Sequence, residues 1–130
     1  MADQAVLTRF HQRFYDDPNT WAKDKWYNIR TEQNPNDIWM IQEVISEVKP
    51  DCVIEAGTFY GGSALIWATI LEQINPEGRV ITIDIEDFTA EASRFPIWQR
   101  RVRFIHASST VRRWWKRSLE RLRGKKLLSS

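Results

Sequence analysis

Short apolar runs alternate with longer helical patterns through the second half of the chain. The runs at 52–55, 79–83 and 102–106 predict β-strands, and the segment 125–128 predicts the start of another. Between the first two runs, apolar residues on several faces predict a deeply packed helix at about 62–74. Strands that alternate with helices are typical of a parallel sheet with right-handed connections.

The first part of the chain predicts helices instead. Apolar residues at helical spacing predict a helix near residues 2–15. Asn34 followed by Pro35 is typical of a helix cap and a first helical position. The helix that starts there carries one apolar stripe, which consists of Ile38, Ile41, Ile45 and Val48. Another helical pattern covers about 110–122.

A glycine-rich loop lies between the first predicted strand and the helix that follows it. The strand ends at Glu55, Gly57 comes next but one, and Gly61, Gly62 and Ser63 open the helix. This order turns backbone N–H groups outward, where they can receive a polar or anionic ligand. A glycine-rich turn without a ligand is the alternative that the pattern leaves open.

An acid ends the neighbouring predicted strand. Asp84 follows an apolar run, and an acid at this place can hold the hydroxyls of a ribose. A dinucleotide fingerprint needs Gly-x-Gly-x-x-Gly, but Phe59 stands where its second glycine belongs. No Gly-Lys-Ser/Thr follows the glycines, which excludes a phosphate-binding P-loop. The pattern therefore predicts a nucleoside-containing cofactor other than a dinucleotide.

The loop pattern Glu-x-Gly-x-x-x-Gly-Gly-Ser resembles the first motif of class I S-adenosylmethionine-dependent methyltransferases. With its surroundings it resembles the family of cephalosporin hydroxylases and rhamnosyl O-methyltransferases, over about residues 26–126. The blocks that carry the resemblance are Thr31–Glu43, Gly61–Leu65, Ile83–Glu86 and Ala107–Thr110. Two positions depart from the family: Tyr60 is often a lysine in such proteins, and Ala107 stands where a glycine is usual.

The resemblance implies an α/β fold, namely a three-layer Rossmann-like methyltransferase fold with a partial parallel sheet of about three or four strands and flanking helices. The first predicted strand is then central, with the second and third on one side and the fourth on the other. Residues 1–50 form an N-terminal helical segment, and residues 51–130 form the N-terminal half of a methyltransferase domain. Ligands bind where the strand order reverses, at the strand ends that carry Glu55, Asp84 and His106.

The resemblance also implies which residues hold S-adenosylmethionine. Gly57 and Gly61 are expected to contact its methionine part through the backbone, and Asp84 is expected to hold its ribose. Gln33 and Asn34 are suggested by the resemblance alone. The expected cofactor-binding set is Glu55, Gly57, Thr58, Tyr60, Gly61, Gly62, Ser63, Asp84, Ile85, Ser108 and Ser109.

Several of these assignments leave an alternative open. Glu55 could accept a hydrogen bond from the amino group of the cofactor, or it could organise the N–H groups of its own loop. Asp84 could instead cap a helix. The serine pair at 108–109 could close the adenine side beside Ile85, or it could cap the helix predicted at 110–122.

The expected function is that of an S-adenosylmethionine-dependent O-methyltransferase whose acceptor is a hydroxyl of a sugar, a glycolipid or another small molecule. The family is expected to hold a divalent metal such as Mg²⁺ with acidic residues from a later part of the domain, and this chain lacks those positions. No catalytic residue or metal ligand is therefore assigned. We expect a truncated chain, the cofactor-binding half of such an enzyme. The alternative is a non-catalytic remnant that acts at most as a binding or interaction module.

Composition and charge limit which partners and which compartment the sequence favours. A formal net charge of +2 is too small to favour nucleic acid, and 42% hydrophobic residues are sufficient for a core. A single cysteine, Cys52, fits a reducing compartment and hence the cytoplasm, and no apolar run is long enough for a membrane span. Because the fourth strand is barely begun, we expect residues 52–54 to present an exposed sheet edge through which the chain can form a homo-oligomer.

Overall fold

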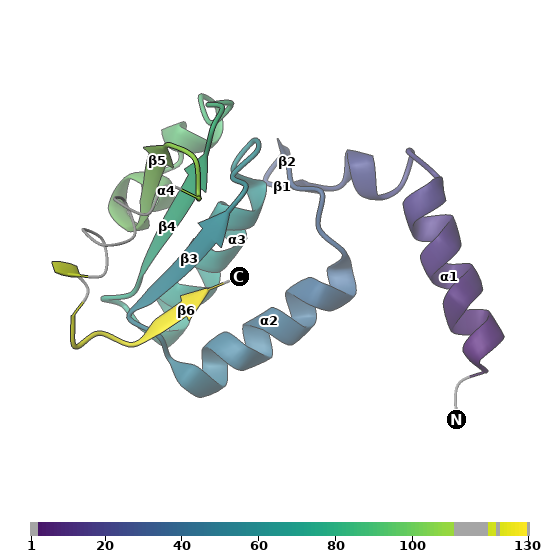
Figure 1. Ribbon diagram of the computed structural model, residues 1–130, viewed down its shortest axis with the longest axis horizontal. Helices are drawn as coiled ribbons and strands as arrows, with labels where there is room; N and C mark the ends of the chain where they lie inside the picture. The colour runs from purple at the N-terminus through teal and green to yellow at the C-terminus, as the bar shows by residue number, and fades with distance from the viewer. Residues whose placement is uncertain (1–2, 111–119, 122, 130) are drawn as a thin grey trace.

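The computed structural model describes residues 3–110, 120–121 and 123–129, which form a parallel sheet, helices on one of its faces and an N-terminal arm (Figure 1). The helices are α1 (Gln4–Asp16), α2 (Pro35–Val48), α3 (Gly62–Ile74) and α4 (Pro96–Arg101), with short 3-10 turns η1 (Trp21–Lys23) and η2 (Ala92–Arg94). The strands are β1 (Lys25–Trp26), β2 (Ile29–Arg30), β3 (Cys52–Ala56), β4 (Arg79–Asp84), β5 (Val102–His106) and β6 (Leu127–Ser129).

The main sheet has the predicted order, β5-β4-β3-β6, and all its pairings are parallel. The prediction that residues 52–54 form an exposed edge is wrong. β6 pairs with all three of them, since Cys52 lies opposite Leu127 and Val53 opposite Leu128. Asp51 fixes this pairing because its carboxylate accepts the N–H of Lys126 at 2.8 Å, and that bond lowers the pKa of Asp51.

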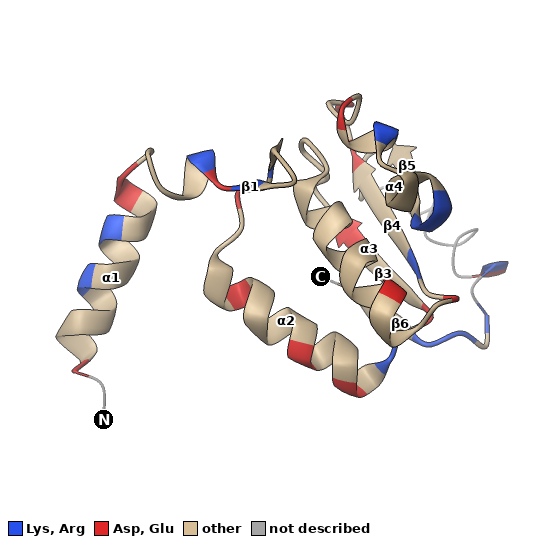
Figure 2. Cartoon of the chain, turned by 180° about the vertical axis from the view of Figure 1, so that it is seen from behind, with Lys and Arg blue, Asp and Glu red and all other residues tan. Residues whose placement is uncertain are grey.

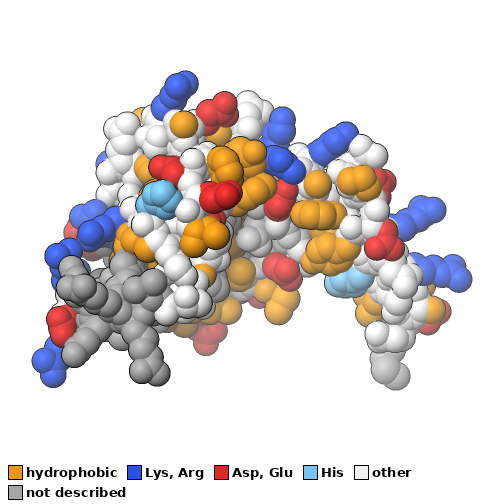
Figure 3. Space-filling view, turned by 45° about the horizontal axis from the view of Figure 1, so that its top comes forward, with side chains coloured by type: hydrophobic (Ala, Val, Ile, Leu, Met, Phe, Trp, Pro, Cys, Tyr) orange, Lys and Arg blue, Asp and Glu red, His pale blue; other side chains and the backbone are white. Residues whose placement is uncertain are grey.

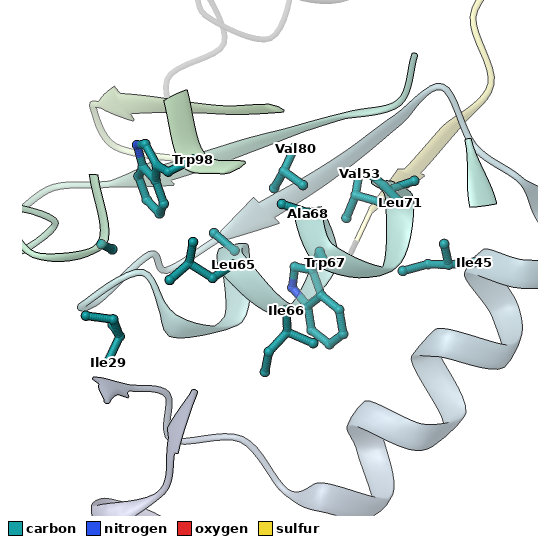
Figure 4. Packing of buried hydrophobic residues seen from close by; sticks show 12 residues of the cluster. Ile29, Ile45, Val53, Leu65, Ile66, Trp67, Ala68, Leu71, Val80 and Trp98 are labelled. Carbon is teal, nitrogen blue, oxygen red and sulfur yellow. The ribbon is translucent and has the colours of Figure 1, made fainter. Parts of the chain in front are cut away.

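The core lies between the sheet and α3, which is apolar on several faces as predicted (Figure 4). Leu65, Trp67 and Leu71 of α3 are each at most 1% exposed, and Val53 and Val80 meet them from the sheet. Other elements close the cluster at its margins, with Ile45 from α2, Ile29 from β2 and Trp98 from α4.

The opposite face of the sheet carries a smaller apolar cluster of Cys52, Ile54 and Ile83. Burial raises the pKa of the Cys52 thiol to about 11, so this cysteine behaves as a small apolar side chain. Most of the helix predicted at 110–122 lies outside the described residues.

α2 begins as predicted, because the side-chain oxygen of Asn34 accepts the N–H of Asn36 at 2.9 Å and Pro35 occupies the first turn. Of its apolar stripe, Ile45 is fully buried, but Val48 is 38% exposed and does not belong to the core face. The β1–β2 hairpin and α4 were not predicted. Within the described residues, none of the helices has the length and apolar character needed to cross a membrane.

Gly62 allows the hairpin to lie directly against the first turn of α3. A Cβ at this position would lie 2.2 Å from the hydroxyl oxygen of Thr31 and 2.6 Å from the carbonyl oxygen of Arg30. The second of these atoms is backbone and cannot rotate away. Gly62 is therefore required by the packing of the hairpin on the helix.

We predict that Gly62→Ala destabilises the chain by about 1–3 kcal/mol, because the added methyl group forces the hairpin away from α3. Equilibrium urea unfolding measures the change. The control is Gln73→Ala, an exposed position of the same helix, which should stay within about 0.5 kcal/mol of the parent chain. Equal stability of both variants would contradict the packing argument.

Candidate functional site

The glycine-rich loop leaves the carboxyl end of β3 beside the carboxyl end of β4. The N–H of Gly57 donates to the carbonyl of Ile83 at 2.8 Å and continues the pairing of the two strands. The backbone then has positive φ at Gly57 (88°), Phe59 (51°) and Gly61 (90°). The N–H of Gly61 closes the turn on the carbonyl of Thr58 at 2.9 Å. Because a bulky residue rarely adopts positive φ, Phe59 is a strained point of the loop.

Asp84 braces this strained point. Its Oδ2 accepts the N–H of Phe59 at 2.9 Å, and its Oδ1 accepts the N–H of Glu86 at 3.2 Å. Neither donor belongs to a helix, so the helix-capping alternative for Asp84 is not what the structure shows. A carboxylate has about four acceptor positions, and the remaining ones can still receive ligand hydroxyls.

Glu55 is buried between the sheet and α3, with 4% of its surface exposed. Its Oε2 accepts the indole N–H of Trp67 at 2.8 Å, and its Oε1 accepts the hydroxyl of Thr82 at 2.7 Å. The Ser63 side chain is a further hydrogen-bond partner. Burial raises the pKa of Glu55 above its ordinary value, the hydrogen bonds act in the opposite direction, and the charge of Asp84 adds to the rise.

A hydroxyl relay extends this network toward the loop. The hydroxyl of Thr58 lies 2.7 Å from that of Thr82, and both side chains are at most 1% exposed. Since Thr82 donates to Glu55, it accepts from Thr58. Glu55 therefore ties side chains of α3 and β4 together, rather than the N–H groups of its own loop. The structure brings Glu55, Thr58 and Ser63 together inside the protein.

A pocket of about 390 Å³ lies between the loop and the start of α2. Its lining consists of Gln33, Asp37, Met40, Ile41, Glu55, Ala56, Gly57 and Trp67. A Cβ built on Gly57 would meet no atom within 4 Å, so the backbone there is open to a ligand. Asp37, in the first turn of α2, supplies an exposed carboxylate that suits a cationic ligand group.

Gly61 has a different environment from Gly57. A Cβ at Gly61 would lie 2.8 Å from the ring of Trp98 and 2.9 Å from the Cβ of Ala92. Contact with the protein, rather than with a ligand, is thus sufficient to explain the glycines at 61 and 62. Their contacts with a cofactor remain predictions.

Tyr60 belongs to an aromatic cluster beside the loop. Its ring stacks on Phe88 with centroids 5.4 Å apart and meets Phe59 edge-on at 4.5 Å. The guanidinium of Arg30 lies 5.4 Å from the ring centroid of Phe59 and 5.5 Å from that of Tyr60, within cation–π range. A second pocket of about 510 Å³ adjoins Tyr60 and Phe88. This cluster holds the outer side of the loop in place.

The expected adenine side is more open. Ile85 is 67% exposed. The hydroxyl of Ser108 accepts the N–H of Thr110 at 3.3 Å, as a residue that caps the following turn does. Ser109 is partly buried beside it, and its contact with adenine remains a prediction. The Nε2 of His106 lies 2.7 Å from the carbonyl oxygen of Ile85, so this ring nitrogen already has a partner.

Sequence reasoning missed Trp67 and Thr82 as partners of Glu55, and it missed Asp37 in the pocket. One signal was present, because Thr82 is a polar residue within an apolar run and lies opposite Glu55 in the strand register. Gln33, suggested by the resemblance, does line the pocket. Asn34 is instead the cap of α2, and its amide also donates to the hydroxyl of Tyr15 at 3.3 Å.

Comparison with known proteins identifies the family and supports the fold. The family model described as Rhamnosyl O-methyltransferase/CmcI matches residues 18–123. The chain belongs to this family. Solved structures show the same fold: CmcI with Mg and SAM superposes with a TM-score of 0.63 at 18% identity, covering 83% of this chain and 45% of that one. CmcI with SAH gives 0.62 at 17% identity, covering 91% and 59%.

Curated relatives are named rhamnosyl O-methyltransferases. The one from Mycobacterium tuberculosis is 39% identical over 80 residues, which cover 62% of this chain and 32% of the relative. The one from Mycobacterium leprae is 30% identical over 108 residues, which cover 82% of this chain and 45% of the relative. The chain thus matches less than half of the length of each of these two relatives.

The described residues do not fit a metal centre. Residues 3–110, 120–121 and 123–129 contain no group of three or more His, Cys, Asp or Glu side chains that could hold a metal ion. No step through a metal is therefore assigned to this chain.

We predict that the raised pKa of Glu55 makes stability fall as pH rises. Between about pH 4.3, where the unfolded carboxyl titrates, and the higher pKa of the folded state, the folded chain binds more protons than the unfolded chain. This contribution is present at acid pH and is lost through that window. Glu55→Gln removes it but keeps the network, because its amide can face Thr82 and its carbonyl oxygen can face Trp67.

Urea unfolding at a series of pH values tests this. As pH rises through this window, the free energy of unfolding of the parent should fall relative to that of Glu55→Gln. Glu55→Leu serves as the control, because it leaves the indole N–H of Trp67 without an acceptor and should cost about 1–3 kcal/mol. Parallel pH profiles for the parent and Glu55→Gln would refute the role of the buried carboxyl.

Proposed function

We propose that this chain binds S-adenosylmethionine at the carboxyl ends of β3 and β4, as the cofactor-binding half of an O-methyltransferase. The observation that carries the proposal is the bare backbone of Gly57, at φ 88° and with open space where a side chain would stand, beside a pocket of about 390 Å³. A ligand can lie against the chain there without displacing protein atoms.

The charges of the pocket suit the methionine part of this cofactor. S-adenosylmethionine carries an ammonium and a sulfonium, and Asp37 supplies a carboxylate at the wall of the pocket. Glu55 also lines the pocket, although its carboxylate oxygens already accept bonds from Trp67 and Thr82. Asp84 has acceptor positions left for the ribose hydroxyls. The adenine would lie near Ile85 and Ser109.

The acceptor of the methyl group is proposed to be a hydroxyl of a sugar, a glycolipid or another small molecule. The support is membership of a family whose curated relatives are named rhamnosyl O-methyltransferases. We also propose a role in lipid biosynthesis, through a glycolipid acceptor, and a cytoplasmic location, because the single cysteine is buried and free. The alternative function is that of a non-catalytic binding or interaction remnant, which keeps this half of the fold without useful affinity for the cofactor.

We predict that the chain binds S-adenosylhomocysteine and has no comparable affinity for NAD, because Phe59 stands where a dinucleotide loop needs a glycine. Isothermal titration with both ligands measures this. Asp84→Ala should weaken binding of S-adenosylhomocysteine by about 1–3 kcal/mol through loss of ribose hydrogen bonds.

Two further variants separate the ribose contact from the bracing of the loop. Asp84→Asn keeps an acceptor for Phe59 and should bind better than Asp84→Ala, whereas Glu77→Ala, in an exposed turn at the opposite end of β4, should bind like the parent. NAD bound as tightly as S-adenosylhomocysteine, or an unchanged affinity in Asp84→Ala, would overturn the assignment.

We predict that the chain by itself transfers no methyl group to sugar hydroxyls, with or without Mg²⁺. Raising the nucleophilicity of a hydroxyl requires a placed base or a metal, and the described residues offer no metal cluster, while Nε2 of His106 is paired with a backbone carbonyl. Radiolabelled S-adenosylmethionine gives the measurement. Repeated turnover by the purified chain would show that a base among the described residues is sufficient.

A further inference from the structure

The N-terminal arm is an amphipathic helix whose apolar side is largely exposed among the residues that the structure describes. Helix α1 has no buried residue among its described side chains. Its apolar stripe consists of Val6, Leu7, Phe10 and Phe14, at the three- and four-residue spacing of one helix face. Val6 is 61% exposed and Phe10 is 51% exposed. A helix of this length is marginal in water without packing.

The arm is held away from its own body. The hydroxyl of Thr20 donates to the carbonyl of Asp17 at 2.6 Å and also contacts that of Phe14, and the indole N–H of Trp21 donates to the carbonyl of Tyr15 at 2.8 Å. These bonds fix the last turn of α1 against η1. The rest of the helix stands apart from the sheet domain (Figure 1), and hydrophobic side chains lie along it in the space-filling view (Figure 3).

Helix α2 presents a second exposed apolar stripe. Met40 is 64% exposed, Val44 is 42% exposed and Val48 is 38% exposed, at consecutive four-residue steps along the helix. The core side of α2 carries Ile41 and Ile45. The stripe therefore lies beside the core face and is exposed among the described residues, and its first member, Met40, also lines the pocket of about 390 Å³ beside the glycine-rich loop.

The charges that flank the two stripes are opposite. Arg9 and Arg13 lie four residues apart on one side of the α1 stripe, and Glu43 and Glu47 lie four residues apart on one side of the α2 stripe. Figure 2 shows basic residues on α1 and acidic residues along α2. The ion pairs of the described residues involve other side chains. Glu43 accepts the indole N–H of Trp39 at 3.3 Å and keeps its negative charge for a basic partner.

We propose that two copies of the chain exchange their arms, so that the α1 stripe of each packs on the α2 stripe of the other. Arg9 and Arg13 of one copy then face Glu43 and Glu47 of the second. Each copy gives one arm and receives one, which closes a twofold dimer. A membrane surface is the weaker occupant, because Asp3, Asp16 and Asp17 at the ends of α1 offset the charge of Arg9 and Arg13.

Sedimentation velocity over a range of concentrations tests the exchange with two charge-reversed variants. Arg9→Glu/Arg13→Glu makes both stripes acidic, and Glu43→Arg/Glu47→Arg makes both basic. The parent should dimerise, and each variant alone should be a folded monomer, because all four positions are exposed. Since dimerisation stabilises the folded chain, each monomeric variant should melt below the parent, and the mixture should recover the parent's melting temperature. An equimolar mixture of the two variants should form heterodimers, since every arm then meets an α2 of opposite charge.

A control separates specific pairing from net charge. Glu77→Arg/Glu91→Arg makes the same change of charge at exposed positions outside both helices and should dimerise like the parent. A monomeric parent would overturn the exchange, and so would a mixture of the two variants that stays monomeric. Dimers that persist in both reversed variants would also overturn it and would indicate another interface, such as pairing through the outer edge of β6. A parent that stays monomeric and instead sediments with anionic vesicles would identify a membrane as the occupant.

Discussion

A carboxylate inside an apolar core must find hydrogen-bond donors, and at Glu55 this requirement fixes how the sheet, α3 and the glycine-rich loop meet. The donors come from separate elements, Trp67 from α3 and Thr82 from β4. Since Thr82 lies opposite Glu55 in the strand register, the carboxylate joins two neighbouring strands as well as a strand and a helix. A slip of either element by one residue would leave a buried polar atom without a partner.

The glycine-rich loop is held in shape by hydrogen bonds to the same strand ends. Thr58 joins the hydroxyl of Thr82, and Asp84 accepts the N–H of Phe59. Positive φ at a bulky residue costs on the order of 1–3 kcal/mol, which the Asp84 bond and the contact of Arg30 with the aromatic rings offset. The loop is thus held in one conformation before a ligand arrives, so that less ordering entropy is lost on binding.

The parts of the fold that repeat a local pattern were predictable from the sequence. The strands follow their apolar runs, Asn34 and Pro35 mark the start of α2, and the strand order followed from the resemblance. The β1–β2 hairpin and α4 were not predictable in this way, because neither has a period long enough to read and Pro96 is the only clear local signal for α4. Both are held by contacts far away in sequence, Ile29 and Trp98 each packing on the core around α3.

The exposed edge expected at residues 52–54 failed for a related reason. The sequence did predict a strand start at 125–128, but a segment this short was not expected to cover the edge of β3. The carboxylate of Asp51 accepts the N–H of Lys126 and holds the segment in register, so that residues 127–129 pair with residues 52–54. In the site, too, some features could be predicted from the sequence and others depend on the tertiary structure. That acids end β3 and β4 was visible in the sequence, whereas the bonds of Glu55 depend on where α3 places Trp67.

The three glycines of the loop look alike in the sequence, but the structure gives each of them a different environment. All three fit one pattern in the sequence, but a side chain would collide with Trp98 at Gly61 and with Thr31 at Gly62, and would meet empty space at Gly57. Gly61 and Gly62 are thus constrained by the fold whether or not a ligand is bound. Gly57 alone is left open to solvent and to a ligand, with only its positive φ to favour glycine. Of the three, it is therefore the position whose open side a cofactor can use, and a side chain added there would meet the ligand before it met the protein.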